Sequence, residues 1–254
     1  MNSISKLKGR FQKVNLIEYS GTDPLKLEKT DQTHRVFTNY HVTGLNKLGE
    51  KEPVELEFIV MKGSNTAIST EEPIQLEHKQ KHSQHISLHI EEEALLMWNN
   101  QEIILNPDSN FTQQIKVSLE GDGEFLWAEI THLSKKQDFF YSSLMEIWVD
   151  EECVAFDPLT FSSTNDLIHH HGMIEDFEYT ASIWYIAEKF PFDEWDVQQR
   201  LSQAKHHRAG MTDLDGKGLL IRWLSKDIKL LRQEVEDVMT FFDQKITEVR
   251  KWRV

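Results

Sequence analysis

Cysteine and long hydrophobic runs are almost absent from this chain. Cys153 is the only cysteine, which excludes an intramolecular disulfide and a thiolate metal cluster. Because Cys153 lies in a predicted strand beside apolar residues, we expect it to lie in the core. No uninterrupted run reaches the roughly 18 apolar residues of a membrane-spanning helix, and the first residues lack the apolar region of a signal peptide. These absences predict a soluble, cytoplasmic protein without a membrane partner.

Positive charge is also scarce. The 254 residues include 42 Asp and Glu against 28 Lys and Arg, which gives a formal net charge of −14. Such a surface repels nucleic acid and anionic lipid, and it suits cationic partners or metal ions. Apolar residues make up 39% of the chain, enough for a sizeable core. We therefore expect one domain over residues 1–254, with residues 1–10 as a loose N-terminal tail.

The familiar catalytic motifs are missing. The chain contains no P-loop, no GxGxxG, no HExxH and no GxSxG. Carboxylate pairs are abundant, but in such an acidic chain their presence carries little information. From motifs alone, the sequence therefore names no catalytic residue.

What the chain does contain is a long series of strand patterns. "IKVSL" (115–119) and "EFLWAEITHL" (124–133) alternate in polarity around the tight turn "EGDG", which is typical of a β-hairpin. A second pair, 139–149 and 153–161, is joined by "DEE". Such segments recur every ten or so residues, which favours an all-β body over alternating βα units.

Helical periodicity appears only near the C-terminal end. Residues 192–207 predict a short helix, 216–224 a strand, and 225–251 a long helix with Ser225 as its N-cap. The apolar residues of the long helix step by three or four: Ile228, Leu231, Val235, Val238, Phe242, Ile246 and Val249. The residues alone thus predict a long β body followed by two helices.

Histidines are spaced suggestively between residues 78 and 90. His78, His82, His85 and His89 would share one helix face and could chelate a metal. From Gln84 onward, however, isoleucine and leucine alternate with polar residues, as in a half-buried strand, and the polar stretch before it predicts a loop. On a strand, His85 and His89 point outward but lie roughly 13 Å apart. We therefore predict solvated histidines that bind no metal.

Two further histidine clusters are less informative. In "HHHG" (169–172) adjacent side chains of an extended chain point apart, so they seldom bind one ion together. "KHHR" (205–208) predicts a helix end, where cationic residues favour the helix dipole.

Two carboxylates stand among apolar residues. Glu129 lies in "EFLWAEITHL", where both strand faces are apolar, and Glu102 is followed by Ile103, Ile104 and Leu105. A buried carboxylate is costly unless a cation or a hydrogen-bond donor meets it. Each could cap a backbone amide or pair with a buried Arg or Lys. Alternatively, both could line an internal polar passage for a cation.

Several collinear stretches resemble the urease accessory protein family UreD, also called UreH. They are "TDPLKLEK" (22–29), "TAISTEEPIQLEH" (66–78), "LLMWNNQEIILNPDSNF" (95–111), "GEFLWAEITHLSKK" (123–136) and "AGMTDLDGKGLLIRWLSKD" (209–227). The resemblance implies a mainly β fold, a flattened β-helix-like body of many short strands with two helices near the C-terminal end.

The resemblance also implies a function in metallocentre assembly rather than catalysis. Proteins of this kind bind the urease structural subunits as a scaffold or chaperone and recruit a UreF-like helical adaptor and a UreG-like GTPase. Nickel then enters the urease active site, for which a passage through the UreD-like protein is the implied route, and no cofactor is tightly bound. Glu102 and Glu129 match acidic positions of the family, and Glu52 approximately matches another.

The chain departs from the family pattern in one segment. The family usually carries a glycine-rich stretch where this chain has "LNKLGEKE" (45–52). Two alternatives therefore stand beside urease maturation. One is a metal-dependent β-fold enzyme whose histidines converge in space, and the other is a generic β-sheet protein-interaction module.

Overall fold

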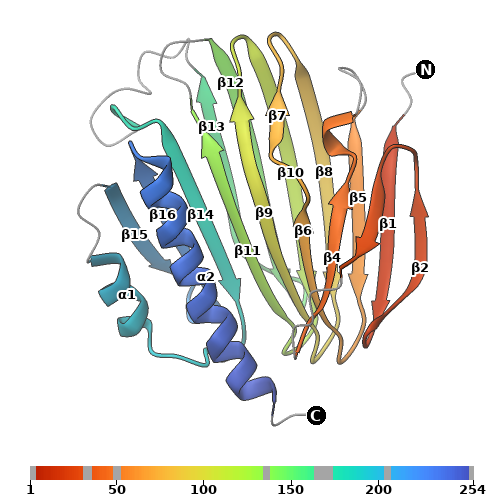
Figure 1. The fold of residues 1–254 in the computed structure, drawn as a ribbon. Helices are drawn as coiled ribbons and strands as arrows, with labels where there is room; N and C mark the ends of the chain where they lie inside the picture. The colour runs from red at the N-terminus through yellow and green to blue at the C-terminus, as the bar shows by residue number, and fades with distance from the viewer. Residues whose placement is uncertain are drawn as a thin grey trace.

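Two β-sheets pack face to face, and two helices lie against the outer face of one of them (Figure 1). The structure, a computed structural model, describes residues 4–30, 36–47, 53–133, 138–162, 174–202 and 207–251. Sheet A has seven strands in the order β13-β12-β10-β8-β5-β1-β2. Sheet B has nine, in the order β15-β16-β14-β11-β9-β6-β4-β3, with β7 paired to β9. The predicted mainly β fold with a β-helix-like body is confirmed.

The strands of sheet A are β1 (Ser5–Gln12), β2 (Asn15–Gly21), β5 (Val54–Val60), β8 (Lys81–Ile90), β10 (Ser109–Leu119), β12 (Phe139–Val149) and β13 (Glu152–Ser162). The strands of sheet B are β3 (Lys26–Lys29), β4 (Thr38–Thr43), β6 (Asn65–Thr70), β7 (Ile74–Leu76), β9 (Leu95–Leu105), β11 (Glu124–His132), β14 (Tyr179–Ile186), β15 (His207–Asp213) and β16 (Gly218–Ser225). The helices of the described residues are the 3-10 turn η1 (Leu45–Lys47), α1 (Glu194–Ser202) and α2 (Ile228–Arg250).

The chain winds as a flattened coil through the centre of the molecule. From β5 to β12 it passes back and forth between the sheets, and each strand pairs in parallel with the strand one coil earlier. Gln84, Gln113 and Ser143 occupy equivalent positions in successive coils, separated by 29 and 30 residues. Residues that are far apart in sequence are therefore stacked in register inside the body.

The hairpin predicted around "EGDG" is wrong. β10 lies in sheet A and β11 in sheet B, so the turn at residues 120–123 is a corner between the sheets. β10 already pairs with β8 on one edge and β12 on the other, which leaves no edge for β11. The second predicted hairpin is confirmed, because β12 and β13 pair antiparallel around Asp150 and Glu151.

The expected loose N-terminal tail is also wrong for the described residues. Residues 5–12 form β1, which pairs in parallel with β5 and buries Leu7 and Phe11 between the sheets. The intervening Lys6, Lys8 and Arg10 point outward, and these cations concealed the period-two pattern of a strand.

The interior is divided into two hydrophobic clusters. One fills the space between the sheets and includes Trp98, Trp127 and Phe58. The other lies between sheet B and α2 and includes Trp223 and Phe242. β11 contributes to both, because its successive side chains alternate between the two clusters. This position explains why both of its faces read as apolar in the sequence.

Both helices predicted near the C-terminal end are present, but some of their predicted end residues are wrong. α1 spans Glu194–Ser202, and His207 and Arg208 belong to β15 rather than to a helix end. The N-cap of α2 is Asp227, whose Oδ1 accepts hydrogen bonds from the backbone N–H groups of Lys229 (2.8 Å) and Leu230 (3.3 Å). The predicted cap, Ser225, is instead the last residue of β16.

The far end of α2 is fixed by a buried guanidinium. Arg250 donates from Nη1 to the backbone oxygen of Glu93 (3.0 Å) and from Nη2 to Glu124 Oε1 (2.9 Å). Asn65 supplies a further acceptor. These contacts join the helix to the corners that precede β6, β9 and β11.

Candidate functional site

Glu102 and Glu129 occupy neighbouring strands of sheet B but opposite faces of it. Glu102 lies in β9 and pairs in register with Ile130 of β11, where a β-bulge falls between Ala128 and Ile130. Glu102 is 7% exposed and Glu129 8% exposed. Both are therefore buried, as the apolar sequence around them predicts.

Glu129 points into the space between the two sheets. Gln113 Nε2 lies 3.0 Å from Glu129 Oε1 and 2.9 Å from Oε2, and the Tyr141 hydroxyl donates to Oε1 at 2.8 Å. The network extends along sheet A, because Gln84 Nε2 donates to Gln113 Oε1 (2.9 Å) and Ser143 Oγ lies 3.0 Å from Gln113 Nε2. A polar layer thus crosses the largely hydrophobic interior between the sheets.

Tyr141 is held in its protonated form. Burial and the neighbouring Glu129 carboxylate both raise the pKa of Tyr141 well above its usual value. The phenol therefore acts as a hydrogen-bond donor to Glu129 at neutral pH. Its ring belongs to a row of stacked rings on sheet A that also includes His82, Phe111 and Phe161.

Glu102 points the other way, toward α2. Arg232 donates from Nη2 to Glu102 Oε2 (2.7 Å) and from Nε to Oε1, and His132 Nε2 lies 2.8 Å from Oε2. Burial alone would raise the pKa of Glu102, but the hydrogen bonds and charges of Arg232 and His132 outweigh it and lower the pKa from 4.5 to about 2. Of the alternatives that the sequence left open, this is the pairing of a buried carboxylate with a cation, although the Arg232 side chain itself is 52% exposed.

A groove runs beside this ion pair, between α2 and the outer face of sheet B. Its apolar lining includes Met97, Ile130 and Met239, and its polar lining includes Arg232 and Glu236. Glu102 lies at this groove, whereas the partners of Glu129 belong to sheet A. The structure therefore does not bring the two carboxylates into one site.

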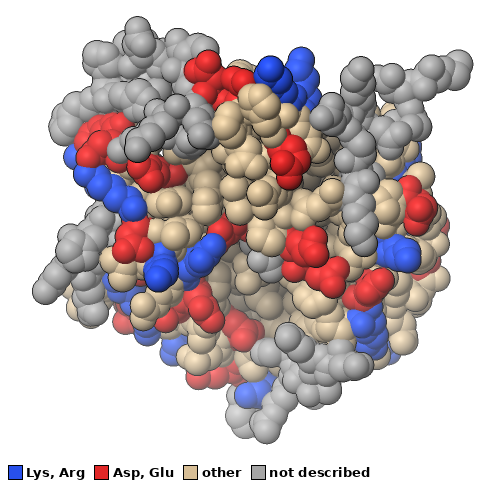
Figure 2. All heavy atoms as spheres, turned by 45° about the horizontal axis from the view of Figure 1, so that its top comes forward, with Lys and Arg blue, Asp and Glu red and all other residues tan. Residues whose placement is uncertain are grey.

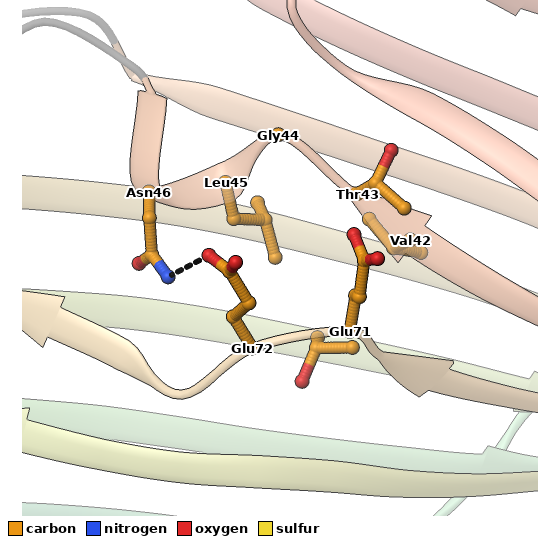
Figure 3. Close-up of a pocket in the computed structure, with 8 residues that line it drawn as sticks. Val42, Thr43, Gly44, Leu45, Asn46, Glu71 and Glu72 are labelled. Atoms are coloured by element: carbon orange, nitrogen blue, oxygen red, sulfur yellow. Dashed lines mark hydrogen bonds between the residues drawn. The ribbon is translucent and has the colours of Figure 1, made fainter.

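The third predicted carboxylate, Glu52, lies outside the described residues. The described residues nearest before Glu52 begin, after β4, with Gly44. Gly44 has a φ of +86°, and a Cβ atom there would collide with the backbone of Pro24, so only glycine fits this position. Figure 3 shows a small pocket here, between the end of β4 and the connection from β6 to β7, with the side chains of Glu71 and Glu72. Asn46 Nδ2 donates to Glu72 Oε2 at 3.3 Å.

The histidines of residues 78–89 do not converge. His78 lies in a turn, and His85 and His89 point outward from β8, as predicted. His82 contradicts the prediction of solvated histidines, because it is buried and stacks on Phe111 with ring centroids 5.5 Å apart. Strand β8 begins at Lys81, earlier than the alternation from Gln84 indicated, so His82 is an inward residue of the same strand.

No metal site is formed by these residues. Within the described ranges, no group of three or more His, Cys, Asp or Glu is arranged to hold a metal ion. The cluster at residues 169–171 lies outside those ranges. Cys153, predicted as a core residue, is exposed, because a bulge in the pairing of β12 with β13 falls beside it, at the end of the hairpin.

Comparison with known proteins assigns the chain to a family. The family model described as UreD urease accessory protein matches residues 54–253. The chain belongs to the UreD family. The resemblance noted in the sequence is therefore confirmed. The matched region contains Glu102 and Glu129 together with all of the coil from β5 to β12 and both α-helices.

Individual relatives of this UreD-family chain are distant. A urease accessory protein UreD of Sporosarcina pasteurii is 27% identical over 167 residues, which cover 63% of this chain and 65% of that protein. A UreD of Lysinibacillus sphaericus is 22% identical over 254 residues, covering 92% and 94%. A UreD of Staphylococcus epidermidis is 23% identical over 154 residues, covering 57% and 55%.

Two features of this UreD-family chain were missed by the sequence reasoning. Gln113 and Tyr141, the partners of Glu129, were not singled out. The signal was present, since the alternation of "IKVSL" extends back through Phe111 and Gln113 and places a polar side chain on the inward face. Arg232 could not be assigned to Glu102, because the two residues are 130 positions apart in the sequence.

Among the residues that the structure describes, neither α1 nor α2 combines the length and the apolar character that crossing a bilayer requires.

Proposed function

We propose that this UreD-family protein is a non-catalytic maturation factor that assists nickel insertion into urease. It acts as a scaffold that binds the apo-urease structural subunits, a UreF-like helical adaptor and a UreG-like GTPase. The family match to UreD urease accessory proteins supports this role. Nickel is cargo in this proposal, and the protein holds no resident metal.

The buried network around Glu129 carries the second part of the proposal, a nickel route through the interior between the sheets. Glu129 offers a carboxylate there, and Gln84, Gln113 and Ser143 extend the polar layer along sheet A. Oxygen ligands bind a borderline ion such as nickel weakly. Weak sites suit an ion in transit, because it must leave as easily as it enters.

Glu102 and Glu52 enter the proposal as further acidic positions of the route. Glu102 lies outside the sheet A–sheet B interior, and Arg232 and His132 already contact its oxygens. It can receive an ion only when that pairing opens. Glu129 is therefore the position at which the route is tested most directly.

The decisive experiment is co-expression with a urease operon that lacks its own UreD-like gene. Wild type, Glu129→Ala and Glu129→Gln are compared by urease activity and by nickel content of the purified urease. We expect both variants to lower the nickel content at least fivefold. Glu129→Gln keeps the shape of the side chain and one acceptor oxygen but replaces the other oxygen with an NH2 donor, so a fall in nickel content would report loss of the carboxylate and not a cavity.

A matched control is Glu57→Gln. Glu57 lies on the outer face of β5 and pairs with the exposed Lys8, so the substitution removes one carboxylate without touching the interior. It should mature urease as wild type does. Folding of each variant is checked by circular dichroism. Normal nickel content of urease with a folded Glu129→Ala variant would rule out this route.

The scaffold role is tested separately by a pull-down with purified components. The full chain should retain apo-urease or the helical adaptor at micromolar concentration, and the Glu129 variants should do so equally. Failure of wild type to retain either one contradicts the scaffold role, whatever the outcome for nickel.

A further inference from the structure

The outer face of sheet A differs from that of sheet B in having no helix packed on it among the described elements. α2 packs mainly on β14, β11 and β16, and α1 on β15, all of which belong to sheet B. In Figure 1, α2 lies in front of sheet B, alongside β14. The side chains that alternate outward from sheet A are therefore available to solvent or to a partner.

Two parts of this face differ in character. Near β1 and β5, the outward residues form ion pairs across the strands, Lys6 with Glu55 (2.6 Å) and Lys8 with Glu57. Such a surface is neutralised by its own charges and remains well hydrated. It offers no reason for a partner to bind there.

The other part of the same face is apolar. Phe156 of β13 is 63% exposed, which is exceptional for a phenylalanine within a strand. It stands opposite Glu146, and Pro158 stands opposite Leu144. The β12–β13 patch is made of the outward apolar residues Phe140, Leu144, Trp148, Phe156 and Pro158, with the half-buried Glu146 between Leu144 and Trp148. Grouped exposed apolar side chains of this kind mark interaction sites.

Acidic residues border one end of the β12–β13 patch. A cavity of about 630 Å³ lies at the corner end of β10 and β12, with Trp148 and Leu119 in its lining. Three carboxylates, those of Glu120, Asp150 and Glu151, also line it. Their charge is opposed there by Lys116 and, when it is protonated, by His89, which contacts Glu120 at 3.1 Å. An indole face among carboxylates favours a cationic side chain.

Figure 2 shows that acidic side chains are also spread over another face of the molecule, interspersed with basic ones. Net negative charge alone therefore does not single out a site. What distinguishes the β12–β13 patch is its arrangement along two adjacent strands. An exposed apolar surface comes first, the indole ring of Trp148 follows, and the carboxylates of the cavity lie beyond it.

We propose that the β12–β13 patch docks a segment of a partner protein that carries aliphatic side chains next to lysine or arginine. The aliphatic residues cover Phe156, Leu144 and Pro158, and the cation lies over Trp148 between Glu120 and Glu151. A second copy of this chain is a poorer occupant, because its net charge of −14 repels the same rim. This surface is independent of the nickel route, since it lies on the opposite side of sheet A from Gln113.

The test uses a fluorescein-labelled peptide with a leucine-rich half and an arginine-rich half, titrated with the full chain at 150 mM salt to screen unspecific attraction. Fluorescence anisotropy measures the dissociation constant. We expect Phe156→Glu to weaken binding at least tenfold. The added negative charge alone would strengthen binding of a cationic peptide, so a loss reports the apolar contact.

The matched control is Ile17→Glu. Ile17 is 50% exposed on β2, at the opposite edge of the same sheet, and the substitution should change the dissociation constant less than twofold. A peptide with glutamate in place of arginine should bind at least tenfold more weakly. Glu120→Gln combined with Glu151→Gln should weaken binding of the arginine peptide three- to tenfold.

Three results would overturn the proposal. The first is equal affinity of Phe156→Glu and wild type for the arginine peptide. The second is an equal loss in Ile17→Glu, and the third is equal binding of the two peptides. Sedimentation of wild type that shows a dimer abolished by Phe156→Glu would assign the patch to a second copy instead. Because Phe156 is mostly exposed, its substitution should leave the circular dichroism spectrum unchanged.

Discussion

The ion pair of Glu102 with Arg232 leads to a quantitative prediction for stability. Substitution of Glu102 by Gln keeps the volume and an acceptor oxygen but removes the negative charge. The lowered pKa of Glu102, from 4.5 to about 2, corresponds to roughly 3 kcal/mol as an upper limit. Arg232 has a side chain that is 52% exposed, and solvent screening reduces the contribution to about 1–2 kcal/mol. Glu102→Gln should therefore lower the free energy of unfolding by that amount at pH 7.

The pH dependence follows from the direction of the shift. Since the pKa of Glu102 is lower in the folded than in the unfolded protein, its stabilising contribution is fully present above pH 4.5. It is lost as the pH falls from 4.5 toward 2, where Glu102 becomes protonated in the folded state too. The difference between wild type and Glu102→Gln should thus be constant from pH 7 to pH 5 and shrink at pH 4 and pH 3.

Urea unfolding followed by tryptophan fluorescence at pH 7, 5, 4 and 3 measures this difference. Because wild type and Glu102→Gln share all other carboxylates, the effect of titrating those groups on the free energy of unfolding cancels in the difference at each pH. Glu57→Gln, on the exposed pair with Lys8, is the control and should behave as wild type at every pH. A Glu102→Gln variant as stable as wild type at pH 7, or a deficit that persists undiminished at pH 3, would refute the reasoning.

Further substitutions probe other parts of the fold, each by urea unfolding unless stated. Phe242→Ala should cost about 3–5 kcal/mol, because the ring is fully buried between α2 and sheet B; a cost below about 1 kcal/mol would contradict that packing. Asp227→Ala should cost about 1 kcal/mol through loss of the N-cap, and Asp227→Asn much less. Arg250→Lys should cost about 2 kcal/mol or more, since one ammonium cannot replace the guanidinium fork. His85→Ala with His89→Ala should leave nickel affinity, measured by equilibrium dialysis, within twofold of wild type.

Local patterns in the sequence correctly predicted the orientation and burial of side chains within a single strand or helix. The alternation in β8 placed His85 and His89 outward, and the periodicity of residues 228–246 identified the buried face of α2. The apolar neighbours of Glu102 and Glu129 correctly indicated that both carboxylates are buried.

Local patterns did not predict which distant segments pair with one another. A turn such as "EGDG" shows that the chain reverses, but not whether the next strand joins the same sheet or the opposite one. The same limit applies to Glu102, because the sequence does not identify a cation 130 residues away on another element. Charged residues also hid a strand in β1, where lysine and arginine alternate with buried Leu7 and Phe11.

The regular coil from β5 to β12 also limits how a chain of this kind can change in length. Removal of one residue within a strand would turn every following side chain of that strand to the other face, and Glu129 or Gln113 would leave the interior. Loss or gain of one complete coil of 29 or 30 residues would instead keep equivalent positions of the remaining coils stacked in register. Evolution can therefore lengthen or shorten this body most readily by whole coils, while single insertions are confined to its corners.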